Sequence, residues 1–306
     1  MKYQGHALGR DVELSIQREG LRLGDRFVDF ADVAALRPVN HRVLVDLLDG
    51  SSVEISMLGF SFDGFWEDLL RSFGDRSLEA LFVDETELMR CEGEYAFPGG
   101  QGRGVILLCP DAVCILPQTA RALRIPLCFT ADLRLEGYQL RLTMSSGIQY
   151  VVGRMGYDTV PFAEQAAKAA DLVKKQRAAA LREVPTAAPF TEKGLFRTKR
   201  PDQYWNAAFG SGVCAVEFYA GEDAATYCYR FSESQPVFLR MLTEAAEAVG
   251  THREIICLPD QRIAEMPLCR MAAARSEAVR FLRSRAAGRL IHTANHAQRL
   301  AEFLRG

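Results

Sequence analysis

Residues 33–67, VAALRPVNHRVLVDLLDGSSVEISMLGFSFDGFWE, match residues 130–164, TADLRLEGYQLRLTMSSGIQYVVGRMGYDTVPFAE, without gaps at an offset of 97. Seven of the 35 aligned pairs are identical: Ala34/Ala131, Leu36/Leu133, Arg37/Arg134, Gly50/Gly147, Gly59/Gly156, Phe65/Phe162 and Glu67/Glu164. Apolar residues are also aligned with apolar residues at Val43/Leu140, Val45/Leu142, Leu47/Met144, Ile55/Val152, Leu58/Met155 and Phe60/Tyr157. Similarity at a fixed offset indicates that one structural module occurs twice.

Each copy has the pattern of two strands, a tight turn and a helix. Asp49-Gly50 is a hairpin signal, because two-residue hairpin turns require a positive φ that glycine adopts easily. Gly147 stands at the matching place in the second copy. Residues 62–73 then carry one apolar helical face, made of Phe62, Phe65, Trp66, Leu69, Leu70 and Phe73. We expect five to seven antiparallel strands closed by one C-terminal helix in each module.

The repeat and the composition along the chain divide it into parts. The first module is assigned to residues 1–90 and the second to residues 91–183, with a longer, alanine-rich closing helix. Residues 184–192, with two prolines and several small residues, are expected to form a linker. Residues 193–306 are expected to form an α+β domain. The predicted fold class is therefore mainly β plus α+β.

The last part has its own pattern of elements. The pattern of residues 213–231, VCAVEFYAGEDAATYCYRF, predicts a further hairpin with Gly221 in its turn. We expect a helix at 235–249, a buried strand at 253–259, and helices at about 271–286 and 294–304.

Composition places the chain among ordinary globular proteins. It has 306 residues, of which 48% are hydrophobic and 25% are charged. No stretch reaches the ~20 apolar residues of a membrane span, and the first residues lack an apolar signal core, so we expect a cytoplasmic protein. The eight cysteines lie mostly in apolar runs and are expected to be buried thiols.

Residues 8–180 resemble tandem bacterial pleckstrin-homology-like (PH/GRAM-like) domains. The resemblance implies a curved antiparallel sheet closed at one end by a helix, and binding of lipids, peptides or proteins rather than catalysis. Lipid-binding members carry basic residues in the loop between their first two strands. This chain has only Arg18-Glu19-Gly20 and Cys109-Pro110-Asp111 at the corresponding turns, and its first module is acidic. The resemblance therefore favours a polypeptide ligand over a lipid.

Motifs for catalysis or cofactor binding are weak. The glycine-rich run at residues 97–104 precedes a strand instead of the Lys-Ser/Thr and helix of a phosphate-binding loop, and a GxSxG nucleophile elbow is missing. His292 and His296 are one helical turn apart, but no third metal ligand is evident near them. We interpret them as a helix start with Thr293 as the cap. The sequence thus predicts no catalytic residue, no bound metal and no cofactor.

Two groups of residues are candidates for partner binding. Tyr204 and Trp205 lie just beyond the linker, where no periodicity assigns them to a core, and exposed aromatic residues anchor interfaces. Residues 261–306 contain nine arginines against three glutamates. Of these, Arg280, Arg283 and Arg285 form a basic run that either covers a solvated helix face or binds an acidic partner.

The preferred hypothesis is a non-catalytic binding or scaffold protein whose ligand is another polypeptide. A second hypothesis is nucleic-acid association through the arginine-rich C-terminal helices. A third is an enzyme of unknown reaction in the C-terminal domain, using His292 and His296. The sequence does not identify the partner or the oligomeric state.

Overall fold

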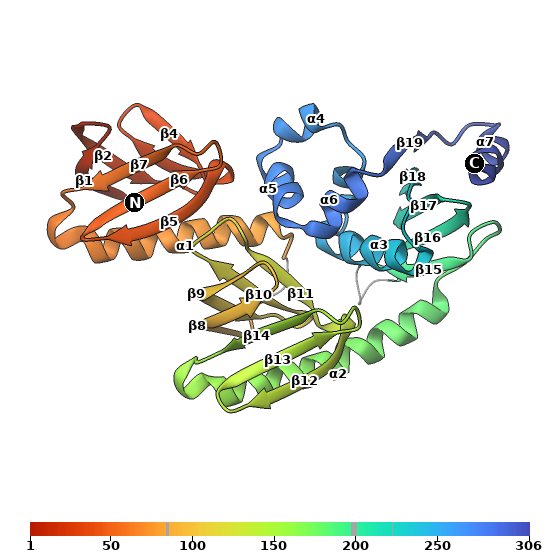
Figure 1. Ribbon diagram of the computed structural model, residues 1–306, viewed down its shortest axis with the longest axis horizontal. Coiled ribbons are helices and arrows are strands. Elements are labelled where there is room, and N and C mark those ends of the chain that lie inside the picture. The colour runs from red at the N-terminus through yellow and green to blue at the C-terminus, as the bar shows by residue number, and fades with distance from the viewer. Residues whose placement is uncertain (84–85, 197–200, 222) are drawn as a thin grey trace.

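Three antiparallel sheets and the helices between them make up the computed structural model, which describes residues 1–83, 86–196, 201–221 and 223–306 (Figure 1). The expected combination of mainly β structure with an α+β part is confirmed. None of the helices in these described ranges is long and apolar enough to cross a membrane.

The first sheet has the strand order β4-β3-β2-β1-β7-β6-β5. Its strands are β1 (Lys2–Ala7), β2 (Arg10–Ile16), β3 (Gly20–Leu23), β4 (Arg26–Asp29), β5 (Val33–Val39), β6 (Arg42–Leu47) and β7 (Ser52–Ser56). The 3-10 helix η1 (Phe30–Asp32) leads into β5, and the 3-10 helix η2 (Gly59–Ser61) leads from β7 into the closing helix α1 (Phe62–Ala80).

The second sheet has the order β11-β10-β9-β8-β14-β13-β12, which is the first order with every strand number raised by seven. Its strands are β8 (Met89–Phe97), β9 (Gly100–Leu108), β10 (Ala112–Pro117), β11 (Leu123–Pro126), β12 (Thr130–Glu136), β13 (Gln139–Met144) and β14 (Gln149–Gly153). The 3-10 helices η3 (Leu127–Phe129) and η4 (Gly156–Asp158) precede β12 and the closing helix α2 (Thr159–Glu183).

The internal repeat is confirmed in backbone detail. Gly50 and Gly147 occupy the same hairpin turn with φ of 86° and 84°. Pairing of β5 with β6 shifts between Val33 and Ala35, and pairing of β12 with β13 shifts at the matching place, between Thr130 and Asp132. Because hydrogen-bonding irregularities are as closely matched as the regular strands, the two copies are one module in geometry as well as in sequence.

Each closing helix covers one core. In the first module Phe65, Leu69 and Phe73 are fully buried against the sheet. In the second module Phe162 fills the place of Phe65, and alanines and Val173 continue the buried face of α2. The apolar spacing of both helices explains which face is buried.

The modules are joined by α1, which runs from the first sheet to the second (Figure 1). Leu78 and Leu81, at the end of this helix, pack with apolar side chains of β9 and β10, among them Leu107, Cys114 and Leu116. The end of α1, from Leu78 onward, therefore packs against the second sheet and fills space between the two modules.

The third sheet has the order β15-β16-β17-β18-β19. Its strands are β15 (Glu192–Leu195), β16 (Gln203–Gly210), β17 (Val213–Ala220), β18 (Asp223–Arg230) and β19 (Ala286–Leu290). The helices of this part are α3 (Gln235–Val249), η5 (Arg253–Ile256, a 3-10 helix), α4 (Asp260–Ala264), α5 (Pro267–Arg275), α6 (Glu277–Arg283) and α7 (His296–Arg305). The predicted hairpin and the helix at 235–249 are confirmed.

Two predictions for this part are wrong. The expected strand at 253–259 is instead the 3-10 helix η5, whose amides bond to nearby carbonyls, as Ile255 N does to His252 O at 3.1 Å. The expected helix at 271–286 breaks at Ser276, whose side chain accepts from Val279 N and starts a new helix. Ala286, the last residue of the expected helix, begins β19 instead.

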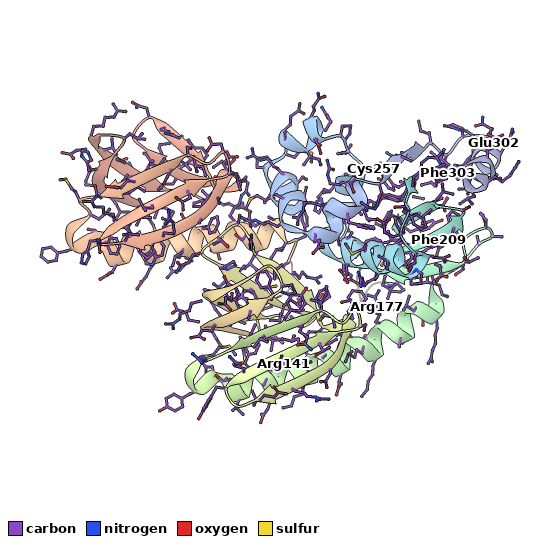
Figure 2. All side chains as sticks on the ribbon, in the orientation of Figure 1. Arg141, Arg177, Phe209, Cys257, Glu302 and Phe303 are labelled. Carbon is purple, nitrogen blue, oxygen red and sulfur yellow. The ribbon has the colours of Figure 1, made fainter. Side chains whose placement is uncertain are left out.

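The segment between the second and third sheets is held at both ends. Val184 and Phe190 are buried, and Lys193 Nζ donates to Val184 O at 3.0 Å. Arg177, near the C-terminal end of α2, pairs with Glu247 of α3. Figure 2 shows Arg177 where α2 approaches α3.

Candidate functional site

The outer edge of β5 is occupied by an extended segment of the second module. Leu36 N donates to Gln118 O at 2.7 Å, and Ala120 N donates to Ala34 O at 2.8 Å. Between these two bonds Ala35 and Thr119 form an antiparallel bridge. The first module therefore already accepts an added strand-like segment at this edge.

The matching edge of the second module is β12. In the described part of the chain, no strand or bridge pairs with the outer side of β12. Leu133, the counterpart of Leu36, is only half-buried, whereas Leu36 is buried in the core of the first module. Ala131, the counterpart of Ala34, is exposed. Because the repeat matches in pairing and in its bulge, Leu133 N and Ala131 O point outward as Leu36 N and Ala34 O do.

Pro38 and Leu135 are another matched pair on these two edges. Proline has no N–H, so an edge strand tolerates it only where that N–H would face away from the sheet. Pro38 therefore marks a position whose amide is not needed for pairing with β6. Leu135 has the same place in β12 and keeps its N–H, and its side chain is 40% exposed.

A second shared feature is the turn before each closing helix. Met57 and Arg154 have positive φ, as have Gly59 and Gly156, so the backbone reverses in the same way in both copies. The residues after these glycines, Phe60 and Tyr157, are fully exposed. Thus each module presents one aromatic ring to solvent at the same position.

The structure corrects the prediction for Trp205 as an exposed aromatic residue. Its side chain is only 2% exposed and belongs to the core of the third sheet. Gly194 of the neighbouring strand makes room for it, because a Cβ there would meet the indole at 2.3 Å. Tyr204 is half-buried, and its ring stacks on Tyr219 with centroids 4.6 Å apart.

The arginines Arg280, Arg283 and Arg285 do not form one free basic surface. Arg283 Nη1 donates to Ile255 O at 2.6 Å and to Leu258 O at 2.8 Å, and Arg283 also pairs with Asp260. These bonds satisfy carbonyls that the irregular segment 253–259 leaves outside a sheet.

The other two arginines of the run also bind within the chain. Arg285 pairs with Glu233, and its guanidinium lies 3.8 Å from the ring centroid of Phe281. Arg280 donates to Ala274 O across the break between α5 and α6. Arg280 and Arg283 lie on α6, which ends at Arg283, so Arg285 lies beyond a helix that was expected to continue to residue 286.

His292 and His296 converge with a residue that the sequence did not reveal. Glu217 of β17 places Oε1 3.7 Å from His292 Nε2 and 4.0 Å from His296 Nε2. The only sequence signal was a single carboxylate inside the apolar run VCAVEFYA, 75 residues before His292. The expected cap is wrong: Asn295 precedes α7, and Thr293 Oγ1 bonds to Asn295 Oδ1 at 2.6 Å.

Electrostatics at this cluster favour the neutral form of His296. Burial and the neighbouring His292 lower the pKa of His296. Burial and the hydrogen bond to Glu217 raise the pKa of Tyr219, so its hydroxyl stays protonated and donates to Glu217.

No family model matches the chain, and no curated protein sequence matches it significantly.

Proposed function

We propose that this chain is a non-catalytic polypeptide-binding protein of scaffold type, and that an extended segment of its partner docks along β12. The observation that carries the proposal is the docking of residues 118–120 on the matching strand β5. Two copies of one module have the same edge geometry, and one edge is filled from within the chain. The other edge offers the same outward groups, Leu133 N and Ala131 O.

Backbone hydrogen bonds supply the affinity in this mode of binding, and side chains beside the edge supply the selectivity. Each such bond contributes about 1 kcal/mol net. The flanking side chains are mixed in charge, with Asp132 and Arg134 paired at 2.6 Å, and the exposed ring of Tyr138 lies in the following turn. A partner segment with an extended backbone and both polar and apolar side chains suits this edge.

The proposal includes a pleckstrin-homology-like character of the two modules. Seven antiparallel strands in one order and a closing helix in each copy support it. This class of module binds ligands at sheet edges and loops without catalytic side chains, and function must still be argued from the site.

The nucleic-acid alternative receives less support from the geometry. Phosphate binding needs guanidinium groups directed to solvent. Arg283 is directed at carbonyls of its own chain, and Arg285 is paired with Glu233.

The test uses Leu135→Pro in the full chain, with Leu135→Ala as the matched control. Both variants remove the leucine side chain, but only proline removes the outward N–H. The fold tolerates the change, because the first module has Pro38 at this position. Peptides selected from a random display library on the wild-type protein should bind Leu135→Ala like the wild type and Leu135→Pro about fivefold more weakly, because one hydrogen bond of about 1 kcal/mol is lost.

Hydrogen exchange gives an independent readout. A bound peptide should slow exchange at the amides of Leu133 and Leu135. Selected peptides that bind Leu135→Pro as well as Leu135→Ala and also leave hydrogen exchange at Leu133 unchanged, or that protect only other strands, would exclude β12 as the docking edge.

A further inference from the structure

Three potential metal-ligand atoms come together at one point of the third sheet. They are Glu217 Oε1, His292 Nε2 and His296 Nε2, and the ligand atoms of this group all lie within 4.8 Å of one another. Glu217 comes from the middle of β17, whereas the histidines flank the turn between β19 and α7. The topology of the sheet, not closeness in sequence, assembles the group.

A threonine hydroxyl contacts all three ligand atoms. Thr226 Oγ1, fully buried on β18, donates to Glu217 Oε1 at 2.8 Å. It also lies 2.8 Å from His292 Nε2 and 3.1 Å from His296 Nε2. Its oxygen thus lies within hydrogen-bond distance of all three ligand atoms, so the three ligand side chains are directed at a common point.

The spacing is close to that of a tetrahedral zinc site. With bonds of about 2.1 Å, two ligand atoms of such an ion are about 3.4 Å apart. The two separations from Glu217 Oε1 are 3.7 Å and 4.0 Å, so these two pairs need to close by only a few tenths of an ångström, and the two imidazole nitrogens lie within 4.8 Å of each other. A neutral histidine frees Nε2 for the metal by carrying its proton on Nδ1.

The surroundings hold the ligands and leave one side open. Tyr219 donates to the other oxygen of Glu217, which fixes the carboxylate from behind, and Tyr204 stacks on Tyr219. Glu217 is 9% exposed by its side chain, whereas His292 is 40% exposed. Solvent can therefore supply a fourth ligand on the side of His292.

We propose that Glu217, His292 and His296 bind one zinc-class divalent ion, with a water molecule in the open fourth position. Two imidazoles and one carboxylate favour zinc over magnesium or calcium, which prefer all-oxygen sites. The ion joins β17 to the segment that leads into α7. It is independent of the β12 edge, because it lies on a different sheet.

The test measures zinc binding by the full chain after removal of metal with a chelator. Competition with a chromophoric chelator should give one zinc ion per chain. His292→Gln, His296→Gln and Glu217→Gln should each weaken binding at least about tenfold. His6→Gln is the matched control: His6 Nδ1 also faces a carboxylate, Asp11 Oδ1 at 2.9 Å, but without a third ligand in the described structure, so binding should not change.

Two further readouts separate this site from other causes. Zinc should raise the thermal midpoint of the wild type and of His6→Gln but not of His292→Gln, because only a ligand bound to the folded state stabilises it. Cobalt bound in place of zinc should lack the thiolate charge-transfer band that binding to any of the eight cysteines would produce.

His292 is the decisive position, because its exposed side chain allows the variant to fold. Zinc binding unchanged in both His292→Gln and His296→Gln would overturn the proposal, and so would a thiolate band from the single bound ion. Failure to bind zinc more tightly than about 1 mM would overturn it as well.

Discussion

Phe60 and Tyr157 stand at the same position of two copies of one module, and both side chains are fully exposed to solvent. Five residues later in each copy, Phe65 and Phe162 are fully buried. The repeat thus preserves an exposed ring and a buried ring on the same helix start. The buried pair is explained by packing, whereas nothing in the fold itself requires the exposed pair.

Replacing Phe60 and Tyr157 by serine should leave stability nearly unchanged. Substitutions at exposed positions that make no packing contacts shift the free energy of unfolding by about 0.5 kcal/mol or less. The check is urea unfolding of the double variant.

The buried pair provides the contrast. Phe65→Ala or Phe162→Ala should cost about 3–5 kcal/mol, because each leaves a cavity in a core. If the serine variant at Phe60 and Tyr157 lost as much unfolding free energy as Phe65→Ala or Phe162→Ala, the exposed positions of the first two rings would be contradicted.

Gly50→Ala and Gly147→Ala should each destabilise the protein by about 1–2 kcal/mol. In the left-handed backbone conformation a Cβ atom comes too close to the following carbonyl oxygen. The added methyl group meets no atom within 4 Å at either site, so the cost arises from φ alone. Asparagine should cost less at both positions, since it adopts positive φ more readily. Thermal unfolding of the two pairs of variants checks this, and a large difference between matched sites would count against equal turns.

The repeat made most of the fold of the first 183 residues predictable. Strand alternation, turn glycines and apolar helix faces are local signals, and two copies reinforce each other. The third sheet was less predictable. The helix break at Ser276 depends on one side-chain cap, and apolar residues 255 and 256 are buried without joining a strand.

The candidate sites depended on contacts between distant residues. Trp205 could not be recognised as buried, because the space for its indole comes from Gly194 on the neighbouring strand. Glu217 could not be joined to His292 before the order of β17, β18 and β19 was known. The open edge of β12 became significant only when residues 118–120 were found on β5.

Glu247→Ala should destabilise the protein by about 3–5 kcal/mol, the usual cost of removing one partner from a buried ion pair. Glu247 pairs with Arg177 of α2, and its Oε2 lies 3.8 Å from Arg124 Nη1 of β11. All three side chains are at most 10% exposed. The loss should loosen α3 from the second module, with faster hydrogen exchange along α3.

The matched control for that experiment is Glu265→Ala. Glu265 pairs with Arg262 at 3.2 Å, but both side chains are more than 60% exposed. An exposed pair of this kind contributes about 0–1 kcal/mol. An equally small effect of Glu247→Ala would mean that the buried charges do not hold α3 in place.

Arg285→Gln should reduce stability in a way that depends on pH. The hydrogen bonds from Arg285 lower the pKa of Glu233 from 4.5 to about 2 in the folded protein. A carboxyl group with a lowered folded-state pKa stabilises the protein above its unfolded-state pKa, and this stabilisation is lost as pH falls toward the folded-state pKa. The difference in urea unfolding between wild type and Arg285→Gln should therefore be full near about pH 6 and shrink between about pH 5 and 2. In a Glu233→Gln background the same substitution should have an effect that no longer changes with pH in this window, because the titrating partner is gone. A difference that stays constant or grows on acidification would show that Arg285 acts through its contact with Phe281, not through the carboxylate.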